Sequence, residues 1–167
     1  MKIFAVALLA VSYCFAQKVT VEFDQGADFS RFHTFALGQG KLNSHNPALN
    51  SDLIRKKLDD SIAHYLEAKG LTEVLNHGDL NVRYHFGSAR KKEIERYPVG
   101  WRGTRTVRIN YTEGTLVIDL RDTSIQSLVW RAIVLEDKND PEKIVSKLDE
   151  MVKKSIAKYP PKPGSTH

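Results

Sequence analysis

Apolar and polar residues alternate in six short segments of this chain, and a repeat of two residues predicts half-buried β-strands. In the first segment, Val19, Val21 and Phe23 share one face, while Thr20 and Glu22 share the other. The six segments are residues 18–24, 32–37, 80–86, 106–111, 116–121 and 128–135. Short connections separate the last three, so we expect them to pair as an antiparallel meander.

Two longer segments show the repeat of an amphipathic helix instead. In the first, Asn50 or Ser51 is suited to cap the helix start, and Gly70 is suited to end it. The second begins at Asp140-Pro141-Glu142 and ends before a proline-rich stretch. The predicted buried stripes are Ile54, Leu58, Ile62, Tyr65 and Leu66, and then Ile144, Val145, Leu148, Met151, Val152, Ile156 and Tyr159.

The order of these elements predicts an α+β fold: a two-layer sandwich with a mostly antiparallel sheet of about six strands and two long helices on one face. Residues 38–50 and 87–103 contain glycine, proline and polar residues and are expected to be loops. We expect residues 17–160 to form a single domain and residues 161–167 to be a disordered tail.

The first sixteen residues have the pattern of a signal peptide. A positive residue, Lys2, precedes nine apolar residues at 3–11, and small residues Cys14 and Ala16 precede Gln17. Nine residues are too few to span about 30 Å of hydrocarbon as a helix. We therefore expect cleavage after Ala16 and export to the periplasm or beyond, with no transmembrane segment in the mature chain. The alternative is a lipid anchor on Cys14, although bulky Tyr13 departs from the lipobox pattern.

The positive charge of the chain is concentrated in one segment. The whole sequence carries a formal net charge of +5. Residues 83–108, hereafter the basic segment, contain eight Lys and Arg residues against Glu93 and Glu95, so they net +6. Tyr97 and Trp101 lie among these cations. Such a mixture favours an anionic partner through charge and stacking. The residues expected to contact it are Arg90, Lys91, Lys92, Arg96, Trp101, Arg102 and Arg105.

No catalytic signature stands out elsewhere. The six histidines lack the local spacing of a metal site, and the mature chain would contain no thiol. Gly38-Gln39-Gly40-Lys41 contains a Gly-Lys pair but not the spacing or trailing hydroxyl of a phosphate-binding loop. Alternation places His33, His85 and Asp119 on solvent-facing sides of strands, from which they could still meet across a sheet. We assign no catalytic, cofactor-binding or metal-binding residue.

Several segments in order resemble the bacterial domain of unknown function 4136 family. They are DFSRFHTF at 28–35, NP at 46–47, KGL at 69–71, DLNVRYH at 79–85, EGTLVIDL at 113–120 and LVWRA at 128–132. The resemblance implies a two-layer α+β domain and an envelope location, in a family often lipidated at a signal-peptide cysteine. It implies no activity.

We interpret the chain as an exported envelope protein, non-enzymatic and without a cofactor, that works by binding or scaffolding. Its expected partner is an anionic envelope polymer, a lipid headgroup or an acidic protein, and not nucleic acid. The alternative is a periplasmic hydrolase with a site around His33, His85 and Asp119. The sequence does not define an oligomeric state.

Overall fold

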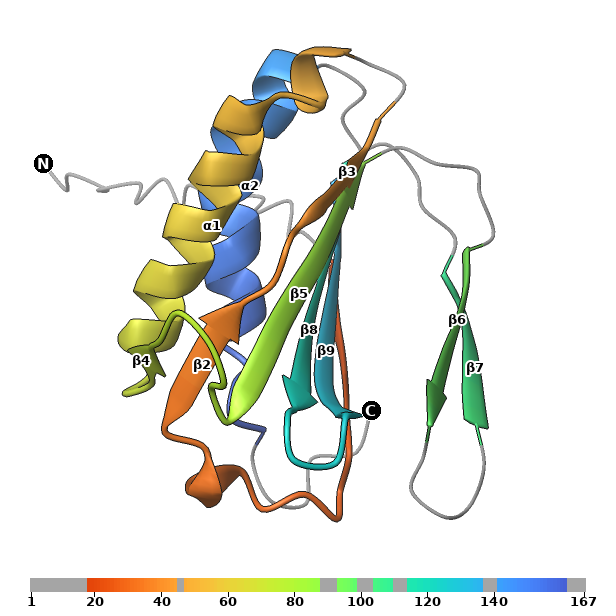
Figure 1. The fold of residues 1–167 in the computed structure, drawn as a ribbon. Coiled ribbons are helices and arrows are strands. Elements are labelled where there is room, and N and C mark those ends of the chain that lie inside the picture. The colour runs from red at the N-terminus through yellow and green to blue at the C-terminus, as the bar shows by residue number, and fades with distance from the viewer. Residues whose placement is uncertain are drawn as a thin grey trace, which may run out of the picture.

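Two long helices lie side by side over one face of a seven-stranded sheet, and a two-stranded hairpin stands on the opposite side of that sheet (Figure 1). The computed structural model describes residues 18–44, 47–87, 93–98, 104–109, 114–136 and 141–161. This arrangement confirms the predicted two-layer α+β class.

The elements follow one another in this order: β1 (Lys18–Phe23), a 3-10 turn η1 (Phe29–Arg31), β2 (Thr34–Leu37), β3 (Lys41–Asn43), a second 3-10 turn η2 (Pro47–Leu49), α1 (Asp52–Glu67), β4 (Thr72–Glu73), β5 (Leu80–Gly87), β6 (Glu93–Pro98), β7 (Thr104–Ile109), β8 (Thr115–Asp122), β9 (Ser127–Leu135) and α2 (Pro141–Ile156).

The large sheet is antiparallel in one part and parallel in the other. Its order is β1-β9-β8-β5-β2-β4, and β3 also pairs with β5. Adjacent strands in the series β1, β9, β8 and β5 run antiparallel to one another, whereas β2 and β3 run parallel to β5. Strand β2 pairs with Leu80 to Val82, and β3 pairs with His85 to Gly87. The two short strands thus share one edge of β5, with residues 38–40 between them.

Helix α1 begins and ends where its sequence predicts. The Ser51 hydroxyl accepts a hydrogen bond from the Ile54 N–H, which satisfies one of the free donors at the helix start. At the other end, Gly70 has a φ of 90°, a conformation that costs a glycine little. This turn lets the Leu71 N–H donate to the Leu66 carbonyl at 3.2 Å and closes the helix.

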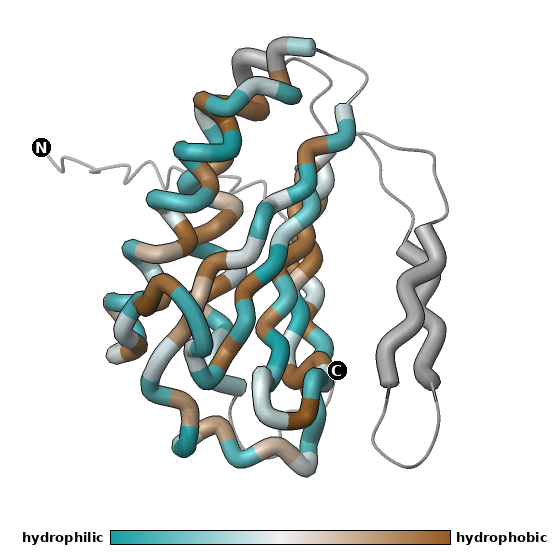
Figure 2. Tube along the Cα trace, in the orientation of Figure 1, coloured by the Kyte–Doolittle hydropathy of each residue, from teal (hydrophilic) through white to brown (hydrophobic). Residues whose placement is uncertain are grey.

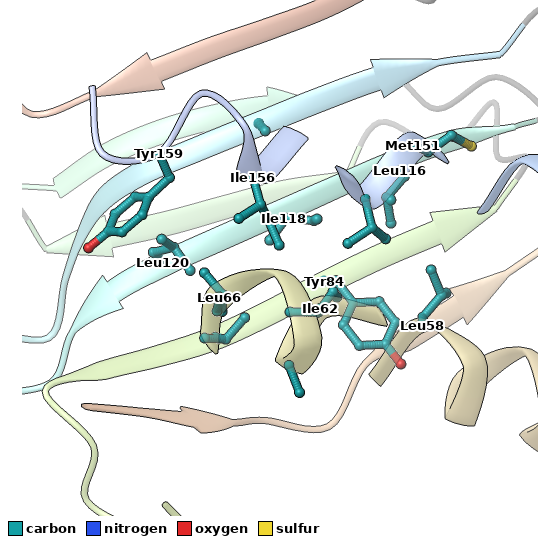
Figure 3. Packing of buried hydrophobic residues seen from close by; sticks show 14 of the residues in the cluster. Leu58, Ile62, Leu66, Tyr84, Leu116, Ile118, Leu120, Met151, Ile156 and Tyr159 are labelled. Carbon is teal, nitrogen blue, oxygen red and sulfur yellow. The ribbon is translucent and has the colours of Figure 1, made fainter. Parts of the chain in front are cut away.

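The core fills the space between the helices and the sheet. Apolar side chains of α1 and α2 pack onto those of β5, β8 and β9 (Figure 3), and apolar positions recur along the helices (Figure 2). The predicted stripes are buried except at Tyr65 and Val145, which are only partly covered. Trp130 is fully buried and meets the Tyr159 ring edge to face, with centroids 5.7 Å apart.

Three details differ from the sequence-based expectation. Residues 38–50, expected to be a loop, include β3 and η2. Residues 87–103, also expected to be a loop, include β6, whose charged residues obscure the apolar alternation of a strand. The expected three-strand meander is wrong, because β7 pairs with β6 in a separate two-stranded sheet. Only β8 and β9 pair with each other as expected.

Across the described ranges, neither helix is both long and apolar enough to cross a membrane.

Candidate functional site

The sheet face turned away from the helices holds polar residues that are nonetheless buried. Asp119 and His85 are only 2% and 7% exposed, so the expectation that both face solvent is wrong. Alternation does place them on the face opposite the helices, but that face is covered. The β6–β7 hairpin stands on this side of the sheet (Figure 1), and β6 approaches β9.

Asp119 forms a bidentate ion pair with Arg131. The two residues are directly opposite each other on β8 and β9. Nε and Nη2 of Arg131 each donate to one carboxylate oxygen at 2.6 Å, and Arg131 is fully buried. Because the pair is held in planar, charge-assisted geometry, it joins the two strands. Its observed role is structural.

His33 lies apart from these residues. Its backbone N–H donates to Asp79 Oδ2 at 2.9 Å, just before β5 begins. The backbone donors of His33 and Thr34 lower the pKa of Asp79. His85 lies five residues beyond the start of β5 at Leu80, about 17 Å along the strand. The structure therefore does not bring His33 together with His85 and Asp119.

The basic segment includes the β6–β7 hairpin. Arg96 pairs in register with Thr106, and Arg105 pairs with Tyr97, so the two arginines occupy neighbouring rungs of the ladder. The other predicted contact residues, Arg90, Lys91, Lys92, Trp101 and Arg102, lie outside the described residues.

A pocket of about 410 Å³ opens where β3, the end of β5 and the start of α1 meet. Its basic lining residues come from three different elements: Lys41 from β3, Arg55 from α1 and His85 from β5. Lys41 and His85 are partners in the parallel ladder. The remaining described lining residues are Gln39, Gly40, Leu42, Asn43, Phe86 and Gly87.

The close approach of Gly40 to Tyr84 shapes this pocket. A Cβ on residue 40 would lie 1.9 Å from the Tyr84 ring, so no larger residue fits without moving the chain. The Arg55 guanidinium donates to the Gly40 carbonyl and ties this loop to α1. The Tyr84 hydroxyl donates to Asp59 Oδ1 at 2.7 Å. Burial, followed by the bond to Asp59, raises the pKa of Tyr84, so the phenol stays protonated.

Sequence reasoning considered only part of this pocket. The sequence of Gly38-Gln39-Gly40-Lys41 does not match a phosphate-binding loop, and the structure agrees. This segment joins two short strands, whereas a phosphate-binding loop joins a strand to a helix. Arg55 gave no sequence signal, since it looks like an ordinary polar residue of an amphipathic helix. Among the described residues, no group of three or more His, Cys, Asp or Glu is placed to hold a metal ion.

Comparison with solved structures finds several chains that are similar to this one. A crystal structure of a DUF4136 family protein from Bacteroides thetaiotaomicron is 14% identical, with a TM-score of 0.62 over 86% of this chain and 96% of that one. The PelC dodecamer from Paraburkholderia phytofirmans is 15% identical, with a TM-score of 0.48 over 84% and 96%. A PDZ domain protein from Parabacteroides distasonis is 20% identical, with a TM-score of 0.47 over 87% of this chain and 35% of that one.

Among curated protein sequences, none matches this chain. Residues 19–161 match a protein family described as "Domain of unknown function (DUF4136)". This match covers nearly all of the sequence after the predicted signal peptide, and the Bacteroides structure supports it through a shared fold. The chain therefore belongs to the DUF4136 family.

Proposed function

We propose that this protein is an exported, non-enzymatic binding domain that contacts a phosphate-bearing component of the cell envelope through its basic segment. The proposed export depends on residues 1–16, whose charged start, apolar centre and small residues at the end fit a cleaved signal. Nucleic acid is not the expected partner in that compartment.

The observation that carries the proposal is the uneven charge. The basic segment nets +6. If Lys2 leaves with the signal peptide, the rest of the mature chain nets −2. A field concentrated in this way attracts anions to one region of the surface and steers their approach.

The fold supports the proposal because the basic segment leaves the main sheet after β5 ends at Gly87. Strand β5 belongs to the seven-stranded sheet, whereas β6 and β7 pair only with each other among the described strands. The hairpin stands beside the sheet, on the side opposite the helices (Figure 1). An arm of this kind can contact an extended surface while the two-layer domain keeps its core intact.

Phosphate is the chemistry shared by the most plentiful anions of an envelope, which are lipid headgroups and phosphate-containing polymers. Arginine suits it, since its planar guanidinium donates two parallel hydrogen bonds to phosphate oxygens. Tyr97 and Trp101 add aromatic surface within the same segment. We propose no enzymatic function, because no observation favours a site formed by His33, His85 and Asp119.

Binding to vesicles tests the proposal. The mature protein is titrated with vesicles containing phosphatidylglycerol, with soluble polyphosphate, and with neutral phosphatidylcholine vesicles. We expect binding to the anionic materials only, and a steep loss with salt as the Debye length falls from about 10 Å at 0.1 M to about 3 Å at 1 M. Binding to vesicles but not to polyphosphate would identify a lipid surface as the partner.

Matched variants locate the contact. Changing Arg90, Lys91 and Lys92 to Gln removes three charges from the basic segment and should weaken binding by on the order of 100-fold, because three losses of roughly 1 kcal/mol each add up to about 3 kcal/mol. Changing Lys56 on α1, Lys153 on α2 and Lys158, just after α2, to Gln removes the same charge from exposed positions elsewhere and should change the affinity less than about threefold. Trp101→Ala should lower affinity without changing the salt dependence.

Two results would overturn the proposal. One is wild-type protein that binds neither anionic material at low salt. The other is equal weakening by the two triple variants, which would mean that only the net charge matters. Selective capture of an acidic protein in place of either phosphate-bearing material would also replace the proposed partner.

A further inference from the structure

The pocket between β3, β5 and α1 has a charge and a shape that the proposed surface contact does not use. Its described lining residues include the cations Lys41 and Arg55 and the imidazole of His85, and none of them is Asp or Glu. The amide side chains of Gln39 and Asn43 belong to the same lining and can donate hydrogen bonds. This composition favours an anion.

The guanidinium of Arg55 is fixed in place at this pocket. It donates to the Gly40 carbonyl, and its Nε lies 3.7 Å from Asp52, whose side chain is fully exposed. About a third of the Arg55 side chain remains exposed. An arginine that is already oriented by a backbone carbonyl loses less conformational freedom when it binds an anion.

The pocket also has an apolar part. Leu42 lines the pocket and is only partly buried, whereas the side chain of its register partner Phe86 is 1% exposed and belongs to the core. The pocket volume of about 410 Å³ falls at the small end of the range for sites that take small organic ligands. The lining is therefore mixed, with cations and amides beside a limited apolar surface.

We infer that this pocket binds a small phosphate monoester whose organic part is apolar. A phosphate monoester carries close to two negative charges near neutral pH, which suits two permanent cations better than the single charge of a carboxylate does. Arg55 and Lys41 hold the phosphate, and the organic group lies toward Leu42. This inference does not depend on the proposed function, because its ligand is a soluble small molecule and its residues are not the predicted contact residues of the basic segment.

Phenyl phosphate is the probe that tests this inference, with inorganic phosphate and phenol as its two separated parts. The binding is followed by amide NMR shifts of the mature protein at fixed pH and low salt. We expect saturable binding of phenyl phosphate, with the largest shifts at residues 39–43 and 85–87. Inorganic phosphate should bind at least about tenfold more weakly at the same residues, and phenol more weakly still.

Charge-removing variants identify the residues that hold the phosphate. Arg55→Gln and Lys41→Gln should each weaken the binding of phenyl phosphate about tenfold, as expected for loss of one charge-assisted contact. Lys56→Gln is the matched control, because Lys56 neighbours Arg55 on α1 but does not line this pocket. The affinity of the Lys56→Gln variant for phenyl phosphate should stay within about twofold of that of the wild type. Thermal unfolding of each variant establishes that it is folded before titration.

The inference is overturned if wild-type protein shows no saturable binding up to about 10 mM, if the shifts centre elsewhere, or if phenol binds as well as phenyl phosphate. Equal weakening by Lys56→Gln would also overturn it. Changing Arg90, Lys91 and Lys92 to Gln separates the two proposals, since this variant should lose vesicle binding and keep phenyl phosphate binding.

Discussion

Among single residues, Asp119 and Arg131 show how a buried charge is accommodated in this sheet. Each is nearly or fully inaccessible, and each would be costly to bury alone. Opposite placement on β8 and β9 allows two hydrogen bonds of 2.6 Å between them. The charges therefore depend on each other, and removing either one leaves the other without its counter-charge.

Asp119→Ala is accordingly expected to destabilise the fold by about 3–5 kcal/mol, the range for breaking a buried ion pair. Replacing both residues by apolar ones, Asp119→Leu with Arg131→Met, should cost less than the single change because both charges of the pair are removed together. Asp60→Ala removes one member of the exposed pair with Lys56 and should cost less than about 0.5 kcal/mol. Urea unfolding measures all three, and a cost below about 1 kcal/mol for Asp119→Ala would contradict this account.

The sequence predicts which side of a strand a residue occupies but not what covers that side. Alternation correctly separates Asp119 from its apolar neighbours Ile118 and Leu120. It cannot reveal that the polar side is itself buried, since that depends on segments distant in the chain. For the same reason, the lining role of Arg55 could not be predicted from its place on a helix.

Between elements, α1 and α2 are joined by one carboxylate as well as by apolar packing. The Ser61 hydroxyl donates to Asp149 Oδ1 at 2.6 Å, and the Tyr65 hydroxyl donates to Oδ2 at 2.9 Å. The hydrogen bond from Ser61, and then that from Tyr65, lower the pKa of Asp149 below its ordinary value. The folded state therefore favours the ionised carboxylate.

This pKa shift predicts a loss of stability in acid. Because the folded pKa of Asp149 is below the unfolded value of about 3.9, its contribution is complete above that pH and is lost as the pH falls through the folded pKa. Asp149→Asn should be less stable than wild type at pH 7, with a difference that shrinks below about pH 4. Ser61→Ala removes the main cause of the shift and should have the same effect in direction. Denaturant unfolding between pH 7 and pH 2.5 checks this, and a difference that is constant with pH would contradict it.

Elements with strong local signals could be predicted, and elements that depend on distant partners could not. Helix α1 has an apolar stripe, a serine cap and a glycine end, and all three features can be recognised from residues that are close together in the sequence. Strand β3 has only three residues and exists because it pairs with the end of β5. Strand β6 is rich in charge, and its partner is β7 and not the large sheet.

At the scale of the whole molecule, two separate sheets are joined in one chain. The two-layer part holds the core, and the β6–β7 hairpin lies on the side of the sheet opposite the helices (Figure 1). The family match and the Bacteroides structure show that this fold recurs, but they bring no activity with them. The charge of the basic segment could be recognised from composition, whereas the pocket could not, because three separate elements form it.

Hydrogen–deuterium exchange of the mature protein, with and without phosphatidylglycerol vesicles, tests the proposed contact most directly. The proposal predicts that vesicles slow amide exchange within residues 88–109, and that about 0.5 M salt abolishes this protection. Exchange in α1, α2 and the seven-stranded sheet should not change, because the core takes no part in the contact. Protection centred on the helices, or no vesicle-dependent protection at low salt, would contradict the proposal.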